Sequence, residues 1–198
     1  MNAKVRQSWE DFLNPEVMRP VLLSASIYIA GFQALKDAII GRIRDFFCYG
    51  FDESGDKIDP KYQSHVLSRN RSPVYASLDW LKYMHAINDT DIEVFERVKT
   101  CRNRLAHRLF PMLGSEGLPQ DFEECFGEMV ALLHKIEVWW IKEVEIPTNP
   151  DFDGKEIFED GIRSGSVISF QLLCDIALGD EDRSRFYIEE FRKQARSG

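Results

Sequence analysis

The chain has 198 residues, of which 44% are hydrophobic and 29% charged, and its formal net charge is −8. This composition is typical of a globular protein with one core, and the acidity argues against broad, non-specific binding of nucleic acid. The four cysteines form no CxxC pair, and the four histidines lack the spacing of metal ligands. We therefore expect reduced thiols in a cytoplasmic protein that holds no metal and no cofactor.

The first predicted helix begins at Asn14. Asparagine as N-cap, Pro15 at the first helical position and Glu16 in the first turn are typical of a helix start, and the apolar pattern continues to about Phe47. Its most apolar window, residues 20–35, is shorter than the roughly 20 residues that a membrane span requires. The polar residues before Asn14 also lack the pattern of a signal peptide. We therefore expect a buried core helix and no membrane partner.

The middle of the chain predicts a loop and then two helices. Turn residues dominate the segment 50–72, where we expect a long loop. A serine and a proline then begin a second predicted helix over residues 73–86. Thr90 and Glu93 have the spacing of a capping box, which predicts a third helix over residues 91–110.

The rest of the chain predicts further helices, and no run of alternating residues indicates a strand. A fourth helix is expected over residues 118–145, and two shorter helices over residues 158–177 and 182–195. The fold class we expect is all-α: a four-helix bundle in residues 1–146, followed by a linker and a C-terminal helical extension in residues 147–198.

The third predicted helix carries a basic run in an acidic protein. Between Arg97 and Arg108 there are five arginines and lysines and no acid, which leaves −13 for the remainder of the chain. At about 100° per residue, Arg102 falls in the middle of the apolar face, and Asn103 and His107 are neighbours at its edge. That apolar face consists of Val94, Phe95, Val98, Cys101, Leu105, Ala106 and Leu109.

The segment RNRLAH, from Arg102 to His107, resembles the R-x4-6-H signature of HEPN domains, including the polar residue that often follows the arginine. The resemblance implies a bundle of about four helices and a metal-independent endoribonuclease. Such enzymes cleave RNA by attack of the ribose 2′-hydroxyl, which leaves a cyclic phosphate. It also implies a homodimer in which two motifs face each other across a shared cleft. The implied setting is a toxin–antitoxin or antiphage defence system, with an antitoxin or defence protein as partner.

The chemistry of the motif residues suits this reaction. Imidazole exchanges a proton near neutral pH, so His107 is the candidate general acid or base. The planar guanidinium of Arg102 matches two phosphate oxygens and stays charged, and Asn103 is placed to orient the imidazole or hold a phosphate oxygen. The remaining basic residues of the run are expected to contact the RNA backbone; these are Arg97, Lys99, Arg104 and Arg108.

The chain departs from the family pattern at two places. Some HEPN toxins carry a tyrosine two positions after the histidine, which a partner nucleotidyltransferase modifies, and Leu109 stands there in this chain. Family members also often have a further polar residue on the first helices. Lys36 or Asp37 could fill that place.

Two alternatives of other classes stay open. One is a non-catalytic HEPN-like dimer that binds a nucleotide or a partner protein. The other is a helical regulator in which the motif is a coincidence, Arg102 is paired with an acid and His107 is exposed. Trp139 and Trp140 could stack on bases, although aromatic residues on a helix more often belong to a core. The segment 68–72, SRNRS, is a second small basic patch.

Overall fold

The computed structural model describes residues 2–53, 55–155, 158 and 161–197, and most of them are helical. The N-terminal half contains α1 (Ala3–Leu13), α2 (Pro15–Lys36), α3 (Arg42–Phe46), β1 (Cys48–Asp52), β2 (Gly55–Ile58) and α4 (Pro73–Tyr83). The C-terminal half contains α5 (Asp89–His107), α6 (Leu109–Pro111), α7 (Phe122–Trp140), α8 (Ile146–Thr148), α9 (Gly165–Leu178) and α10 (Glu181–Ser197). The expected all-α class is confirmed.

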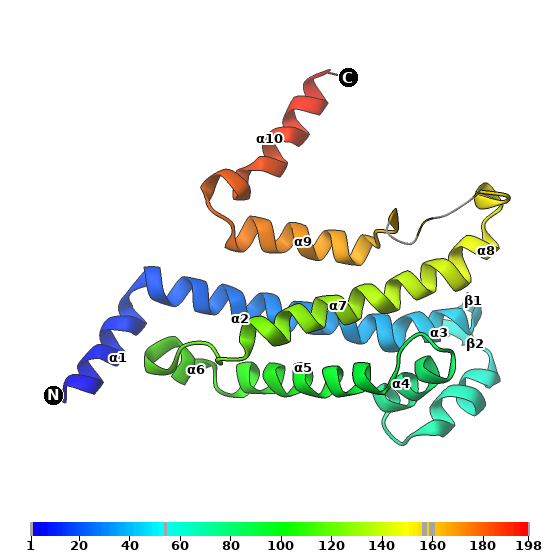
Figure 1. The fold of residues 1–198 in the computed structure, drawn as a ribbon, viewed down its shortest axis with the longest axis horizontal. Helices are drawn as coiled ribbons and strands as arrows, with labels where there is room; N and C mark the ends of the chain where they lie inside the picture. Colours follow the sequence, from blue (N-terminus) through cyan, green and yellow to red (C-terminus); the bar gives the residue numbers. More distant parts are fainter. Residues whose placement is uncertain (1, 54, 156–157, 159–160, 198) are drawn as a thin grey trace.

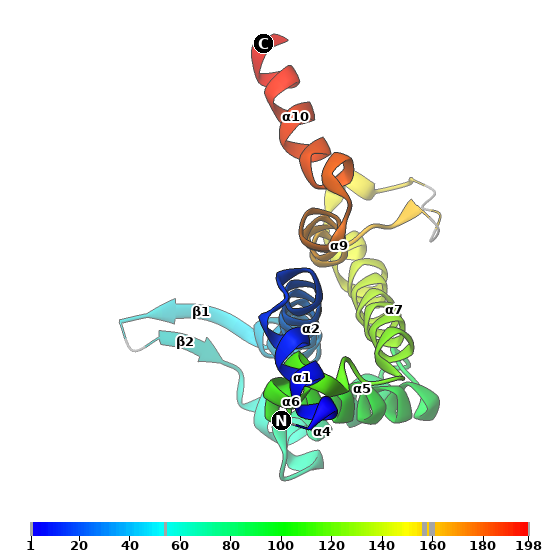
Figure 2. The same cartoon turned by 90° about the vertical axis from the view of Figure 1, so that its left-hand side faces the viewer.

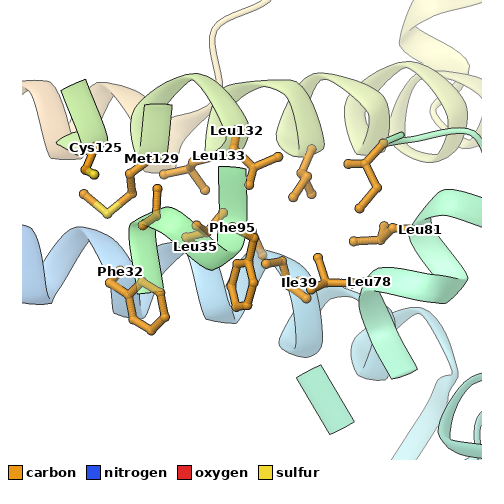
Figure 3. Packing of buried hydrophobic residues seen from close by; sticks show 14 of the residues in the cluster. Phe32, Leu35, Ile39, Leu78, Leu81, Phe95, Cys125, Met129, Leu132 and Leu133 are labelled. Atoms are coloured by element: carbon orange, nitrogen blue, oxygen red, sulfur yellow. The ribbon is translucent and has the colours of Figure 1, made fainter. Parts of the chain in front are cut away.

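The core lies between α2, α4, α5 and α7. The long helices α2, α5 and α7 run side by side, and α4 packs at one end of them (Figure 1). Each helix presents apolar residues at helical spacing to the common centre, and Figure 3 shows how these side chains meet. The members labelled there include Phe32, Leu35 and Ile39 of α2, Leu78 and Leu81 of α4, Phe95 of α5, and Met129, Leu132 and Leu133 of α7.

The first long helix begins as predicted. The side-chain oxygen of Asn14 accepts a hydrogen bond from the backbone N–H of Glu16 at 3.0 Å, and Pro15 is the first helical residue. A π-helical turn, Asp37–Gly41, joins α2 to α3, so the helix continues to Phe46. This stretch is the one candidate membrane span among the described residues by length and composition, a test that the core helix of a soluble protein also passes.

The segment 50–72 differs from the expected loop. It contains part of an antiparallel hairpin, in which Phe51 pairs with Asp56, and then short helical turns from Tyr62 to Arg69. Gly55 has a φ of 110°, which a residue with a side chain rarely adopts, and this allows the tight turn. The hairpin projects from the helices (Figure 2). Because Phe51 is 85% exposed, the strands lack the buried face that would reveal them in the sequence.

The start of α5 also corrects a prediction. Asn88, not Thr90, is the N-cap: its side chain accepts from the N–H of Asp91 at 3.1 Å, and the Asp91 carboxylate accepts from the N–H of Asn88 at 2.7 Å. The spacing of a polar residue and an acid three positions later therefore occurs twice, and the structure uses the first pair, Asn88 and Asp91, as the cap. Ile87 and Ile92 occupy the positions of a hydrophobic staple around this cap, and Ile87 is buried. The helix ends at His107 rather than Phe110.

The C-terminal extension is joined to the bundle through α9. Phe170 is buried in the common core, opposite Gly31 of α2. A Cβ at Gly31 would come within 2.6 Å of both Met129 and Phe170, so the close approach of α2, α7 and α9 requires glycine there. Beyond α9, α10 extends away from the bundle (Figure 1). The predicted helix 158–177 corresponds to α9, and its positions 159–160 lie outside the described residues.

Two further features differ from the sequence predictions: an additional helix at the N-terminus and the start of α7. The helix α1, before Asn14, was not predicted, although Val5, Trp9 and Phe12 have helical spacing. The fourth predicted helix corresponds to α7, which begins at Phe122 and continues through a π-helical turn to Glu145.

Candidate functional site

Arg102 lies on the side of α5 that faces α2, and it is half-buried there. Its guanidinium carbon is 4.7 Å from the centre of the Phe32 ring, which is the geometry of a cation–π contact. It has no ion pair or hydrogen bond with any residue that the structure describes. An ion pair between Arg102 and an acid, which one of the alternatives predicted, is therefore not formed among the described residues. Its charge remains available to a ligand on the seam between α2 and α5.

The platform under Arg102 belongs to the core. Phe32 is buried and stacks on Phe95, with ring centres 5.9 Å apart. One turn earlier on α2, the hydroxyl of Tyr28 donates to the backbone oxygen of Val98 at 3.0 Å. That oxygen lies one helical turn before Arg102, so Tyr28 and Phe32 together hold this part of α5 against α2. Sequence reasoning missed both residues, because their partners on α5 are about 70 positions away.

Asn103 and His107 lie on the open side of the same helix. Asn103 is half-buried, and His107 is exposed at the last residue of α5. They are four positions apart, which places their Cβ atoms roughly 6 Å from each other. Neither side chain has a hydrogen-bond partner within the described parts of the chain. Both side chains therefore have polar groups available to a ligand from solvent.

The four other basic residues of the run have acidic partners. Arg104 donates from Nη2 to both oxygens of Asp121, at 2.6 and 2.5 Å. Arg108 is 2.8 Å from Glu116, and the Nε of Arg97 is 3.1 Å from Glu128. Lys99 lies 3.4 Å from Glu96 and also hydrogen-bonds Tyr75. The predicted RNA contacts Arg97, Lys99, Arg104 and Arg108 are thus charge-compensated within the protein.

These pairs shift the pKa values in the direction that opposite charges require. The hydrogen bond from Arg104 lowers the pKa of the Asp121 carboxyl below its ordinary value, and the same bond raises the pKa of Arg104. Hydrogen bonds to Glu128 and Tyr75 likewise raise the pKa values of Arg97 and Lys99. The segment 116–128 supplies three of the four acids. Arg97 and Arg104 connect α5 to Glu128 of α7 and to its N-cap Asp121, whereas Arg108 pairs with Glu116 of the π-helical turn before α7.

Lys36 is a second cation on the seam. It follows Phe32 by one turn of α2 and is half-buried. No ion pair joins it to a residue in the described part of the chain, whereas Asp37 accepts a hydrogen bond from Gln33 at 3.0 Å. Of the two residues that could supply the further polar group on the first helices, Lys36 is the one on the same face as the Arg102 platform.

Near His107, not all residues of the predicted apolar face of α5 are buried. Phe95, Val98, Cys101 and Leu105 are buried as expected, but Ala106 is exposed, which corrects its assignment to the core. Phe110, three residues after His107, is 78% exposed. Ile29 of α2, one turn before Phe32, is exposed as well. The surface around the motif is thus partly apolar.

The described residues contain no group of three or more His, Cys, Asp or Glu side chains that could hold a metal ion. Cys101 and Cys125 are buried in the core, and burial raises the pKa of the Cys125 thiol to about 12. Such a thiol is a packing residue rather than a nucleophile.

Comparisons of the chain with protein-family models, with curated proteins and with solved structures found no match.

Proposed function

We propose that the protein is a metal-independent endoribonuclease of the HEPN type, with Arg102, Asn103 and His107 as its active-site residues. The observation that carries the proposal is the contrast within one basic run. Four of the five cations are paired with acids, and Arg102, the first residue of the RNxxxH motif, is not. A half-buried arginine without an acid is costly unless it binds an anion, and an RNA phosphate is such an anion.

The proposed reaction transfers the RNA phosphate from the 5′-oxygen to the 2′-oxygen of the preceding ribose. A base removes the proton of the 2′-hydroxyl, the new O–P bond forms, and the leaving 5′-oxygen receives a proton from an acid. His107 serves as one of these proton-transfer groups. Arg102 stabilises the charge that develops on the phosphorane, with Lys36 as a second cation on the seam. Asn103 orients the imidazole or the phosphate.

A homodimer completes the proposed cleft. One chain supplies a single histidine, whereas the reaction requires both a base and an acid. A second copy would place its own motif opposite the first. The exposed side chains of Phe110, Ile29 and Ala106 beside the motif are suited to such an interface. The variant Phe110→Glu should therefore yield monomers in sedimentation experiments and lose activity, although its core is unchanged.

The decisive experiment measures RNA cleavage in EDTA by the wild type and by His107→Ala and Arg102→Lys. We expect 2′,3′-cyclic phosphate ends from the wild type. Loss of proton transfer should lower the rate by about 10²–10⁴-fold in His107→Ala. Arg102→Lys should also lose most activity, because an ammonium lacks the planar fork. His65→Ala, an exposed histidine outside the motif, is the matched control and should stay fully active.

Each variant must keep the circular dichroism and sedimentation of the wild type for this comparison to hold. Cleavage that persists undiminished in His107→Ala would contradict the mechanism. It would favour the non-catalytic alternative, in which the helical dimer binds a nucleotide or a partner protein and any RNA cleavage comes from elsewhere. A defence or toxin–antitoxin setting is part of the proposal and would be tested by expression: the wild type should arrest growth and His107→Ala should not.

A further inference from the structure

The β-hairpin exposes two aromatic side chains on one short strand. Phe51 of β1 is 85% exposed, more than any other large apolar side chain in the described residues, and Tyr49 of the same strand is 72% exposed. Single exposed apolar residues are ordinary on a protein surface, whereas apolar residues that gather in one place mark interaction sites. The two rings therefore make β1 a candidate surface for binding another molecule.

The hairpin lies at the end of the bundle away from His107. In Figure 1, β1 and β2 are drawn beside α4, opposite α6. A cavity of about 1090 Å³, formed by α3, α4, the C-terminal part of α7 and Arg163, lies at the same end. Lys135, which lines this cavity, pairs with Asp91 in the first turn of α5 at 2.5 Å. From Asp91 to His107 the helix rises roughly 24 Å, so this end is separate from the RNxxxH motif. The aromatic residues that line the cavity are Phe46, Trp80, Trp139 and Trp140.

The edges of the hairpin are open to a further strand. In the described part of the chain β1 and β2 form a sheet of two strands, so each has one edge without a neighbouring strand. The unpaired N–H and C=O groups of such an edge are a template for an added strand, and a sheet of only two strands is marginally stable in water. The register shifts between Cys48 and Gly50, which places Tyr49 at a bulge. Bulges are frequent beside functional sites, where they redirect a side chain.

The hairpin and its two flanks are acidic even when every basic residue is counted. In residues 44–61, five acids stand against three basic residues, which gives a net charge of −2. Two of the basic residues are used inside this segment, because Arg44 lies 2.8 Å from Asp56 and Lys57 lies 3.0 Å from Asp52. The acids that form no ion pair with a described residue are Asp45, Glu53 and Asp59.

This charge decides which molecule can cover the edge. A second copy of the hairpin would place acids opposite acids, which is destabilising across a sheet, and charged side chains are a usual means of keeping edge strands apart. The phosphates of a nucleic acid would be repelled for the same reason. A basic polypeptide would be attracted, and its arginine and lysine side chains can lie over the rings of Tyr49 and Phe51 in cation–π contacts.

We propose that the free edge of β1 binds an extended, basic segment of a partner protein as a third strand. Backbone hydrogen bonds along β1 hold the segment, as in other cases of strand addition. Side chains alternate between the two faces of a strand, so every second arginine or lysine of the segment lies on the same face. These cations contact the exposed rings and the unpaired acids Asp45 and Glu53. The site does not depend on the nuclease proposal, since it shares no residue with the motif.

A peptide of defined composition tests the proposal. A fluorescein-labelled heptapeptide in which arginine and valine alternate is titrated with the full-length protein, and fluorescence anisotropy reports binding. We expect saturable binding with a Kd below about 0.1 mM. The same peptide with proline at two adjacent central positions should bind at least about tenfold more weakly, because proline cannot donate a hydrogen bond to the neighbouring strand.

Two pairs of variants locate the peptide on the hairpin. Phe51→Ala should weaken binding about twofold to fivefold, which is the worth of one exposed cation–π contact. Phe186→Ala, which removes an exposed ring from α10, is its matched control and should bind as the wild type does.

The second pair concerns charge. Asp45→Asn combined with Glu53→Gln should weaken binding about threefold or more, because two exposed charge pairs are lost. Asp151→Asn combined with Asp153→Asn removes the same charge from exposed positions elsewhere and should have no effect. All of these side chains are exposed, and circular dichroism of each variant should match that of the wild type.

Several outcomes would overturn the proposal. The first is no saturable binding of the arginine–valine peptide below about 1 mM. Equal affinity for a glutamate–valine peptide would exclude a basic partner, and undiminished binding of the proline peptide would exclude strand addition. Equal losses in the two double variants would show that the peptide responds only to the net charge of the protein. If Phe51→Ala abolished binding of a single-stranded oligodeoxynucleotide and left peptide binding unchanged, the occupant would be a nucleic acid.

Discussion

The two ends of α5 are built in different ways. At its C-terminal end the candidate residues stand within six consecutive positions: Arg102 faces α2, and Asn103 and His107 lie on the open side of the helix. At its N-terminal end the cavity is assembled from segments between Phe46 and Arg163 that meet only in the folded chain. The comparison shows two kinds of arrangement. The candidate motif is a local pattern on a platform of core residues, and the cavity is created by packing of segments far apart in the sequence.

The charged residues at the two ends of α5 also differ in their arrangement. Within the basic run, each of the other four cations has its own acid, as with Arg104 and Asp121, and Arg102 has none among the described residues. The cavity at the other end is lined by Lys135, Lys142, Glu143 and Arg163 together with four aromatic rings, and Lys135 pairs with Asp91. Because Arg102 has no acidic partner among the described residues, its charge is suited to binding a phosphate.

The largest effect we expect is on stability, from Phe32→Ala. Phe32 is 4% exposed and carries both the Phe95 stack and the Arg102 contact. Removing the ring leaves a cavity, and substitutions of this type cost about 3–5 kcal/mol in the free energy of unfolding. Urea denaturation followed by circular dichroism measures the loss. Phe51→Ala, at an exposed position of the hairpin, is the matched control and should change the stability little.

The result decides whether the motif end is tied to the core. If Phe32→Ala costs less than about 1 kcal/mol, the platform under Arg102 does not exist in solution. The contact between α2 and α5 would then be weak, and Arg102 would not be held on a rigid platform of core residues.

The next effect is smaller and has the opposite sign. His85→Gly should stabilise the protein by about 1 kcal/mol, because a residue with a Cβ pays about 1–2 kcal/mol for the left-handed conformation that glycine adopts freely, less the entropy that glycine gains on unfolding. The melting temperature should rise by several degrees. His65→Gly, at a helical position, is the matched control and should lower it. A His85→Gly variant that is no more stable than the wild type would show that the left-handed conformation of His85 carries no strain.

Much of the helical organisation could be predicted because its signals are local. The Asn14–Pro15 start and the Ser72–Pro73 start depend on a few adjacent residues, and both are used as predicted. The α5 cap was misplaced because two overlapping segments have the same spacing, and only the position of Ile87 in the core selects Asn88. The hairpin was missed because exposed strands have no buried face to produce an alternating pattern.

The candidate sites divide along the same line. The motif was visible in the sequence, and Arg102 faces α2 as the helical spacing requires. The acids that compensate Arg97, Arg104 and Arg108 come from the segment 116–128, and no local pattern on α5 indicates them. The cavity was beyond sequence reasoning. Trp139 and Trp140 were assigned to the core or to base stacking, and only the approach of α3 and α4 shows that they line a space.

The smallest effect concerns the compensated charges and depends on pH. The hydrogen bond from Arg104 lowers the pKa of Asp121, so the folded protein holds this carboxylate deprotonated to lower pH than the unfolded chain does. The pair therefore stabilises the fold at pH values above the unfolded pKa, and its contribution is lost as the pH falls through the lowered folded pKa. Both side chains are well exposed, at 39% and 45%, so the contribution at pH 7 should be at most about 1 kcal/mol.

Urea denaturation of the wild type and Asp121→Asn should show this difference at pH 7 and not at a pH below the folded pKa. Salt at about 1 M should also reduce it, because exposed charges are screened. Asp153→Asn, an exposed carboxylate outside the pair, is the control and should show no such dependence. A pH-independent loss in Asp121→Asn would mean that Asp121 acts through hydrogen-bond geometry at the start of α7. The basic run would then owe its place on α5 to something other than the acids of segment 116–128, and the distinction between Arg102 and its neighbours would lose its electrostatic basis.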